Sequence, residues 1–184
     1  MIVCVLTSAA GARADPVLPM FAGAGVGAGG FTANAYEFVE AGVAVHPALP
    51  IFVHAVLAHG SWDVEDVGGG DYTRGEVGLL ARGCSRTGRA CGYASLDGGD
   101  VHFSDVRVGN CDVEPFTGCD SVTLRGLTAG GHAGLDAGGR HLRVRIGLQV
   151  AHAFGSRFDL ATYRPQPYSL ANAVGLDLEL LVMR

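Results

Sequence analysis

Strict alternation of apolar and polar residues constrains this chain more than any other feature. It is clearest in the segment 141–152, where aliphatic side chains occupy the even positions and polar or small side chains occupy the odd ones. A period of two residues predicts a β-strand and excludes an amphipathic helix, which repeats every 3.6 residues. The aliphatic positions are Leu142, Val144, Ile146, Leu148 and Val150.

The same alternation recurs along the chain and predicts eight strands. The segments 92–103 and 122–134 show it weakly, and the glycine-rich segment 18–29 is assigned mainly by its position. Each segment reaches the ~9–11 residues that a tilted strand needs to cross a bilayer. Compact turns alternate with longer polar connections at 62–70, 104–121 and 153–168. We therefore predict an all-β, eight-stranded antiparallel up-and-down transmembrane β-barrel with strands at 18–29, 34–45, 51–61, 71–82, 92–103, 122–134, 140–152 and 169–183.

Composition indicates which face of these strands points outward. Charged residues make up 17% of the chain, and every basic side chain apart from histidine is arginine. Soluble proteins carry about 25% charged residues, so the aliphatic face is expected to contact lipid. Aromatic side chains gather at the ends of the longer connections, and we expect them at the membrane–water boundary. They are Phe31, Tyr36, Trp62, Tyr72, Phe103, Phe154, Phe158, Tyr163 and Tyr168.

The opposite face collects charged and polar residues into a predicted lumen network. Acids and bases are nearly balanced in it, and buried charges must be paired because unpaired ones cost several kcal/mol each. Eight strands enclose about enough space for side chains alone, which predicts a filled interior. The network comprises Glu40, His54, Arg74, Glu76, Arg125, Arg143, Arg145, Gln149, Asp177 and Glu179.

The N-terminal segment 1–14 is predicted to be a signal peptide, leaving 15–184 as the barrel. A short apolar stretch leads to Ala12-Arg13-Ala14, which fits the small-x-small pattern of a cleavage site. The segment 15–184 holds four cysteines, an even number that suggests disulfides in an exported protein. Their local spacing favours Cys84 with Cys91 and Cys111 with Cys119.

In this architecture the segment 15–184 resembles the small eight-stranded outer-membrane barrels, the class of the OmpA transmembrane domain and OmpX. The resemblance rests on strand number and alternation, without a signature motif. It implies the outer membrane of a diderm bacterium, insertion by the barrel-assembly machinery, and a monomer surrounded by outer-membrane lipid. That class usually ends its last strand in an aromatic residue, whereas this chain ends Leu181-Val182-Met183-Arg184.

Function is less constrained than fold. We expect a structural, surface-interaction or envelope-stability role, with a small-solute pore and a soluble secreted β-sandwich or lipocalin-like binding protein as alternatives. No enzymatic activity is predicted, since His152 near Ser156 and Asp159 looks like an ordinary polar loop. The net charge of −5 gives no reason to expect nucleic acid. The acidic residues assigned to loops, which include Asp97 and Asp100, match no EF-hand, and neither a metal nor another cofactor is predicted.

Overall fold

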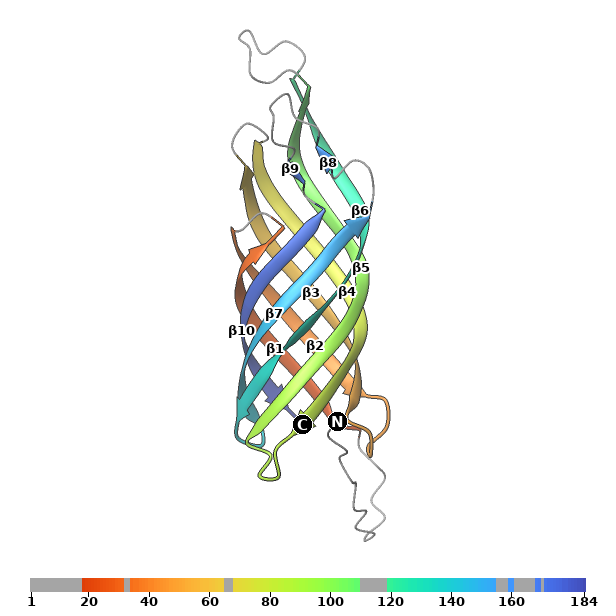
Figure 1. The fold of residues 1–184 in the computed structure, drawn as a ribbon, viewed down its shortest axis with the longest axis vertical. Coiled ribbons are helices and arrows are strands. Elements are labelled where there is room, and N and C mark those ends of the chain that lie inside the picture. Colours follow the sequence, from red (N-terminus) through yellow and green to blue (C-terminus); the bar gives the residue numbers. More distant parts are fainter. Residues whose placement is uncertain are drawn as a thin grey trace.

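A computed structural model shows the chain as a β-barrel (Figure 1). The residues it describes are 18–31, 34–64, 68–109, 119–154, 159–160, 168–169 and 171–184. The predicted signal peptide lies outside these ranges. Among the described residues, no helix is long and apolar enough to cross a membrane.

Eight long strands build the barrel, and two short ones form a separate sheet. The long strands are β1 (Met20–Gly30), β2 (Asn34–Ala44), β3 (Ile51–Val64), β4 (Gly68–Cys84), β5 (Ala90–Gly109), β6 (Cys119–Gly138), β7 (Leu142–Phe154) and β10 (Asn172–Met183). The short strands β8 (Asp159–Leu160) and β9 (Tyr168–Ser169) pair only with each other.

Each long strand pairs antiparallel with its neighbours in sequence, and β1 closes the barrel against β10. The closing register runs from Phe21 opposite Met183 to Gly30 opposite Val174. Figure 1 shows the start of β1 and the C-terminus at one end of the barrel, called here the terminal end, while β5 and β6 reach beyond the other strands at the far end. The predicted all-β, eight-stranded up-and-down fold is confirmed.

Several strands are longer than the sequence predicted. Strands β5 and β6 each span 20 residues, against predictions of 92–103 and 122–134. Alternation is weak in both segments, and the backbone pairing continues beyond the residues in which the alternation can be recognised. A register shift between Phe103 and Val106, where Asp105 has a φ of 57°, lies within the added part of β5.

The aliphatic face points outward around the whole barrel. On β7 the side chains alternate without interruption between exposed and buried, and Leu142 through Val150 are 52–56% exposed at the even positions. The partner residues on β10 repeat this pattern, with Val174 through Val182 51–62% exposed. Charged side chains occupy the buried face, so the barrel is polar inside and apolar outside.

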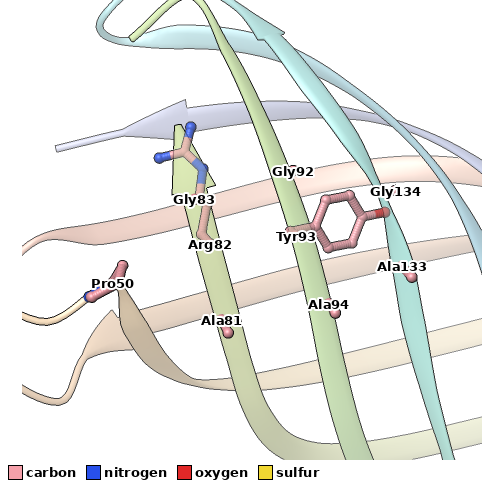
Figure 2. Close-up of a pocket in the computed structure, with 9 residues that line it drawn as sticks. All are labelled: Pro50, Ala81, Arg82, Gly83, Gly92, Tyr93, Ala94, Ala133 and Gly134. Carbon is pink, nitrogen blue, oxygen red and sulfur yellow. The ribbon is translucent and has the colours of Figure 1, made fainter. Parts of the chain in front are cut away.

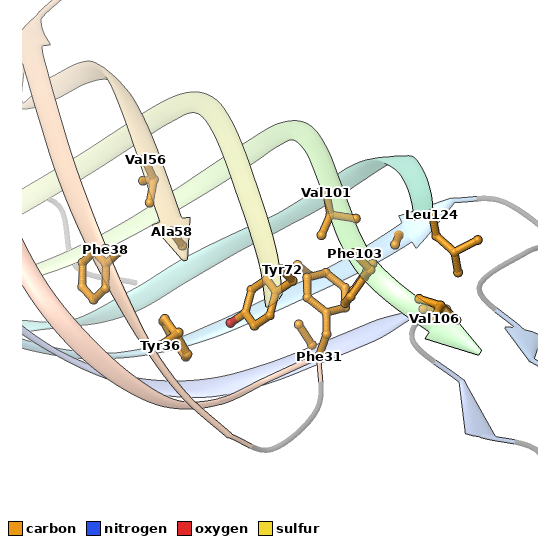
Figure 3. Close-up of a cluster of buried hydrophobic side chains, with 14 residues drawn as sticks. Phe31, Tyr36, Phe38, Val56, Ala58, Tyr72, Val101, Phe103, Val106 and Leu124 are labelled. Carbon is orange, nitrogen blue, oxygen red and sulfur yellow. The ribbon is translucent and has the colours of Figure 1, made fainter. Parts of the chain in front are cut away.

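Aromatic residues close the far end of the lumen, which corrects one prediction. Phe31, Tyr36, Tyr72 and Phe103 were expected at the outer boundary of a membrane, but all are at most 5% exposed and pack inside the barrel (Figure 3). Ring centroids lie 5.5 Å apart for Phe31 and Phe103, and 5.8 Å apart for Tyr72 and Phe103. Phe154 does point outward, whereas the side chains of Trp62, Phe158, Tyr163 and Tyr168 lie outside the described residues.

The parity of the strands explains this inward placement. Tyr36 lies four residues from Glu40, and Tyr72 lies two residues from Arg74, so each shares a face with a lumen residue. Small residues on adjacent strands make the room that these rings occupy. A Cβ added at Gly27 would overlap the ring of Tyr36.

The close approach of glycine to the aromatic cluster can be tested at Gly60. A Cβ there would lie 2.7 Å from Tyr72 Cε1 and 2.8 Å from Tyr36 Cβ. Because both rings are buried and cannot move aside, Gly60→Ala should lower the free energy of unfolding by ~1–3 kcal/mol. Urea unfolding in detergent micelles would measure it. Gly92→Ala is the control, since its Cβ would meet nothing closer than 3.9 Å and unfolding should be unchanged.

Candidate functional site

The lumen is the candidate functional site, because it gathers most of the charged side chains of the barrel. Nine of the ten residues predicted to line it are at most 7% exposed and face inward. They are Glu40, His54, Arg74, Glu76, Arg143, Arg145, Gln149, Asp177 and Glu179.

Arg125 was predicted to face the lumen, and this prediction is wrong. Its side chain is 73% exposed and lies 3.7 Å from Asp100 on the outer face of the barrel. Leu124 and Thr128, which have the opposite parity on β6, fill the inner face instead. The weak alternation of this segment, with leucines on both faces, hid its orientation.

An arginine–aspartate cluster fills the terminal end of the lumen. Asp136 accepts two hydrogen bonds from Arg82, each 2.8 Å long, and a third from Arg143 Nε. Arg143 also donates to the backbone carbonyls of Gly88 at 2.9 Å and Arg89 at 3.1 Å. These bonds join the interior to the turn between β4 and β5, so the cluster ties that turn across the mouth of the barrel.

A disulfide fastens the same turn. Cys84 and Cys91 are bonded across the ends of β4 and β5, as their spacing predicted. Cys111 and the side chain of Cys119 lie outside the described residues, and their pairing remains a prediction.

Arg145 joins two carboxylates in the next layer. Its Nη1 lies 2.5 Å from Glu40 Oε2 and 3.0 Å from Glu179 Oε2, on strands β2 and β10. The guanidinium also lies over the ring of Tyr93, 4.2 Å from its centroid. One buried cation therefore links side chains from four strands.

His54 connects this layer to the middle of the lumen. Its Nδ1 lies 2.8 Å from Glu40 Oε1, and its Nε2 lies 2.7 Å from Asp97 Oδ1. Asp97 was assigned to an exposed acidic loop, but it is 7% exposed and lies within β5. The opening for its carboxylate is provided by Gly78 on β4, because a Cβ at that position would overlap Asp97 Oδ1.

A second set of polar contacts lies beneath the aromatic cluster. Arg74 donates from Nη2 to Gln149 Oε1, and its Nε lies 3.3 Å from Glu76 Oε2. Thr128 donates to Glu76 Oε1 at 3.1 Å, and Tyr36 donates to Asp177 Oδ1. The tyrosine hydroxyl thus joins the aromatic cluster to the charge network.

Negative charge exceeds positive charge in this interior, which the sequence analysis did not anticipate. Among the described residues, six carboxylates face the lumen and four guanidiniums pair with them, so two negative charges remain when the histidines are neutral. Asp97 and Asp136 are the two acids that the sequence analysis missed. Each had been assigned to a loop or turn, although its parity matches that of buried neighbours such as Tyr93 and Thr128.

A hollow on the outer face of β4–β6 differs in character from the lumen (Figure 2). Its lining is mainly alanine and glycine, including Ala81, Gly92 and Ala133. Arg82 turns away from it toward Asp136. The described lining therefore offers van der Waals contact and no charged or polar side chain that points into it.

The loop considered for catalysis is only partly described. His152 is exposed and its Nδ1 lies 2.9 Å from Asn172 Oδ1, while Ser156 lies outside the described residues.

Because Arg145 joins two buried carboxylates, we expect its replacement to lower the stability of the barrel strongly. Arg145→Met should lower the free energy of unfolding by ~3–5 kcal/mol, because Glu40 and Glu179 would remain buried without their shared cation. Adding Glu40→Gln should restore part of the loss. Arg86→Ala in an exposed turn is the control and should stay within ~0.5 kcal/mol of the unsubstituted protein. An equally small effect of Arg145→Met in urea unfolding would contradict the role given to this residue.

Solved structures share this architecture at low sequence identity. Neisserial surface protein A (NspA) aligns with a TM-score of 0.56 and 8% identity, covering 90% of this chain and 95% of that one. The N-terminal barrel domain of Pseudomonas aeruginosa OprF gives 0.52 and 13%, covering 90% and 97%. The attachment invasion locus protein Ail of Yersinia pestis gives 0.51 and 8%, covering 91% and 99%. Neither a family model nor a curated protein matches the sequence. The chain has the fold of the small eight-stranded outer-membrane barrels.

Proposed function

We propose that this protein is a monomeric outer-membrane barrel of a diderm bacterium, with a filled lumen and a structural, surface-interaction or envelope-stability role. The observation that carries the proposal is a continuous apolar belt of suitable height around the outside of the barrel. Its aliphatic side chains are more than one-third exposed on β1–β7 and β10 alike.

Polar residues bound this belt at the far end. Outward-facing polar side chains form a ring that follows the strand pairing, with Glu37 opposite His59, His59 opposite Thr73, and His102 opposite Arg125. On the opposite side of the barrel, His152 pairs with Asn172. This ring marks where the apolar surface gives way to one suited to water and lipid headgroups.

Basic residues bound the belt at the terminal end. The three turns there contain His46, Arg86, Arg89, Arg140 and His141. From Leu142 to His152 there are ten residue steps of ~3.3 Å, which span about 25 Å along the barrel axis at a strand tilt of ~40°. That height equals the ~25 Å apolar band of outer-membrane barrels. A soluble sandwich or lipocalin-like barrel would turn these aliphatic side chains inward, so their outward placement favours the membrane.

The ends of the barrel have different roles in this proposal. The start of β1, the C-terminus and the short turns face the periplasm, and the ends of β5 and β6 project on the outer side (Figure 1). Because the described residues of the lumen pack tightly, transport is disfavoured, and the projecting ends of β5 and β6 offer the natural surface for interaction. Insertion would depend on the barrel-assembly machinery, as the resemblance implies.

A depth profile along β7 tests the lipid contact. Ile146→Arg places a charge at mid-belt and should cost ~2–4 kcal/mol in folding into lipid vesicles, while Leu142→Arg and Val150→Arg near the boundaries should cost roughly 0–1 kcal/mol. Urea titration of folding into vesicles gives these values. Equal costs at the three positions would contradict a membrane location.

Conductance tests the filled lumen against the small-solute pore. Arg74 and Gln149 are at most 2% exposed in the middle of the barrel, and Phe103 is fully buried at the far end. The purified barrel should therefore show no steady conductance in a planar bilayer. Gly60→Ala disturbs the packing of the aromatic cluster, so ion leakage through the lumen should be easier to detect in this variant than in the unsubstituted barrel. Steady conductance from the unsubstituted barrel would favour the pore.

A further inference from the structure

Three potential metal ligands meet in the middle of the lumen. Glu76, Asp97 and His132 come from the adjacent strands β4, β5 and β6, and each offers one ligand atom, all within 4.8 Å of one another. We propose that this cluster binds one divalent first-row transition-metal ion, such as Zn²⁺, as a structural element of the barrel. The sequence predicted no metal, because Asp97 and His132 lie in the two segments with weak alternation.

The orientation of His132 suits a ligand. Its Nδ1 lies 3.3 Å from Asp177 Oδ2, and its Nε2 lies 3.8 Å from Asp97 Oδ2. A carboxylate beside Nδ1 favours the proton on that nitrogen and leaves the lone pair of Nε2 facing the cluster. This carboxylate–histidine pair is the arrangement that usually supports a metal-bound histidine. Asp177 Oδ2 is buried and has no other hydrogen-bond partner, so it is available to accept a hydrogen bond from the Nδ1–H group of His132.

Hydrogen bonds from neighbouring hydroxyl groups also position the other two ligands, Glu76 and Asp97. Thr128 donates to Glu76 Oε1 at 3.1 Å, and Ser95 donates to Asp97 Oδ2 at 2.7 Å. Ser95 Oγ also accepts a hydrogen bond of 3.0 Å from the backbone N–H of His132. The hydroxyl therefore fixes the positions of two ligands relative to each other, as supporting groups do in metal sites.

The charge of the lumen gives independent support. Six carboxylates face four guanidiniums and His54, whose two ring nitrogens both lie within 2.8 Å of carboxylate oxygens and so both donate. At least one negative charge then remains without a buried partner. Such an excess must be compensated, either by a further proton on His132 or a carboxyl group or by a bound cation. A bound cation supplies positive charge at the place where Glu76 and Asp97 approach each other.

The ligand types select the class of ion. Imidazole nitrogen with carboxylate oxygens suits Zn²⁺ and its first-row neighbours, whereas Ca²⁺ and Mg²⁺ prefer oxygen ligands throughout. Zinc bonds to these atoms are ~2.0–2.2 Å long, so the three side chains would draw together on binding. Three protein ligands leave a fourth position for water.

Zinc retention provides the test. The full chain, stripped of metal with a chelator in urea, is refolded in detergent with and without Zn²⁺, desalted and analysed by atomic emission. We expect one zinc per folded chain and a higher urea midpoint with zinc than without it. A folded wild-type barrel that retains no zinc, with a midpoint unaffected by the ion, would overturn the proposal and leave protons as the compensating charges.

Three variants locate the bound ion. His132→Gln removes a ligand and should abolish retention, while Asp177→Asn removes its supporting carboxylate and should weaken zinc affinity by ~10–100-fold. His152→Gln is the matched control, because this histidine is exposed on the outer face. Loss of zinc from His152→Gln, or full retention by His132→Gln, would overturn the assignment.

If His132→Gln fails to fold, cobalt replaces the variant as the test. The wild-type barrel refolded with Co²⁺ should give the visible absorption of a four- or five-coordinate nitrogen–oxygen site. The spectrum of hexaaqua Co²⁺ alone would overturn the proposal.

Discussion

Pairing of buried arginines with carboxylates is the interaction on which the rest of this structure depends. An apolar outer face leaves the polar residues of each strand on the inner face, where eight strands leave space only for side chains. Charges confined there are costly unless each finds a partner. Arginine meets this requirement because its planar fork reaches several acceptors at once, as Arg143 does at the terminal end and Arg145 does between β2 and β10.

Glycine makes this packing possible. Tyr36, Phe38 and Glu179 lie across the inner face of β1, and the inward positions opposite them are glycines. Larger residues there would collide with the rings and the carboxylate. The glycine-rich character of β1 is thus a consequence of the large side chains on its neighbours, since total interior volume is fixed by strand number.

The sequence predicted the fold well and the interior less completely. Alternation located all eight strands and the inward face of β2, β3, β4, β7 and β10, because one face of each of these strands is mainly aliphatic along its middle part. It failed on β6, where Leu124 faces inward and Leu127 faces outward. There Arg125 was placed on the wrong face and Asp136 was assigned to a turn.

The errors on β5 and the aromatic residues have a related cause. A carboxylate such as Asp97 beside glycines has the composition of a loop, and only the pairing of β5 with both neighbours shows that it lies in the lumen. Aromatic side chains suit both a membrane boundary and a packed core, so residue type alone could not decide between them. The even spacing between Tyr36 and Glu40 puts both side chains on the same face of β2. Because the alternation of the neighbouring strands identified that face as the polar, inward one, the spacing predicts that Tyr36 points into the lumen.

The position of the charges between two apolar clusters has a further physical consequence. Phe21, Phe52, Leu80 and Leu181 pack at the terminal end, and the aromatic cluster of Figure 3 closes the far end. The network between them is therefore shielded from bulk water. Electrostatic interactions inside this interior are stronger than in water, and salt screens them only weakly. Any ion that compensates the excess carboxylates must then enter before both clusters have packed. We therefore expect the charge balance of the lumen to be set during folding and to stay fixed in the finished barrel.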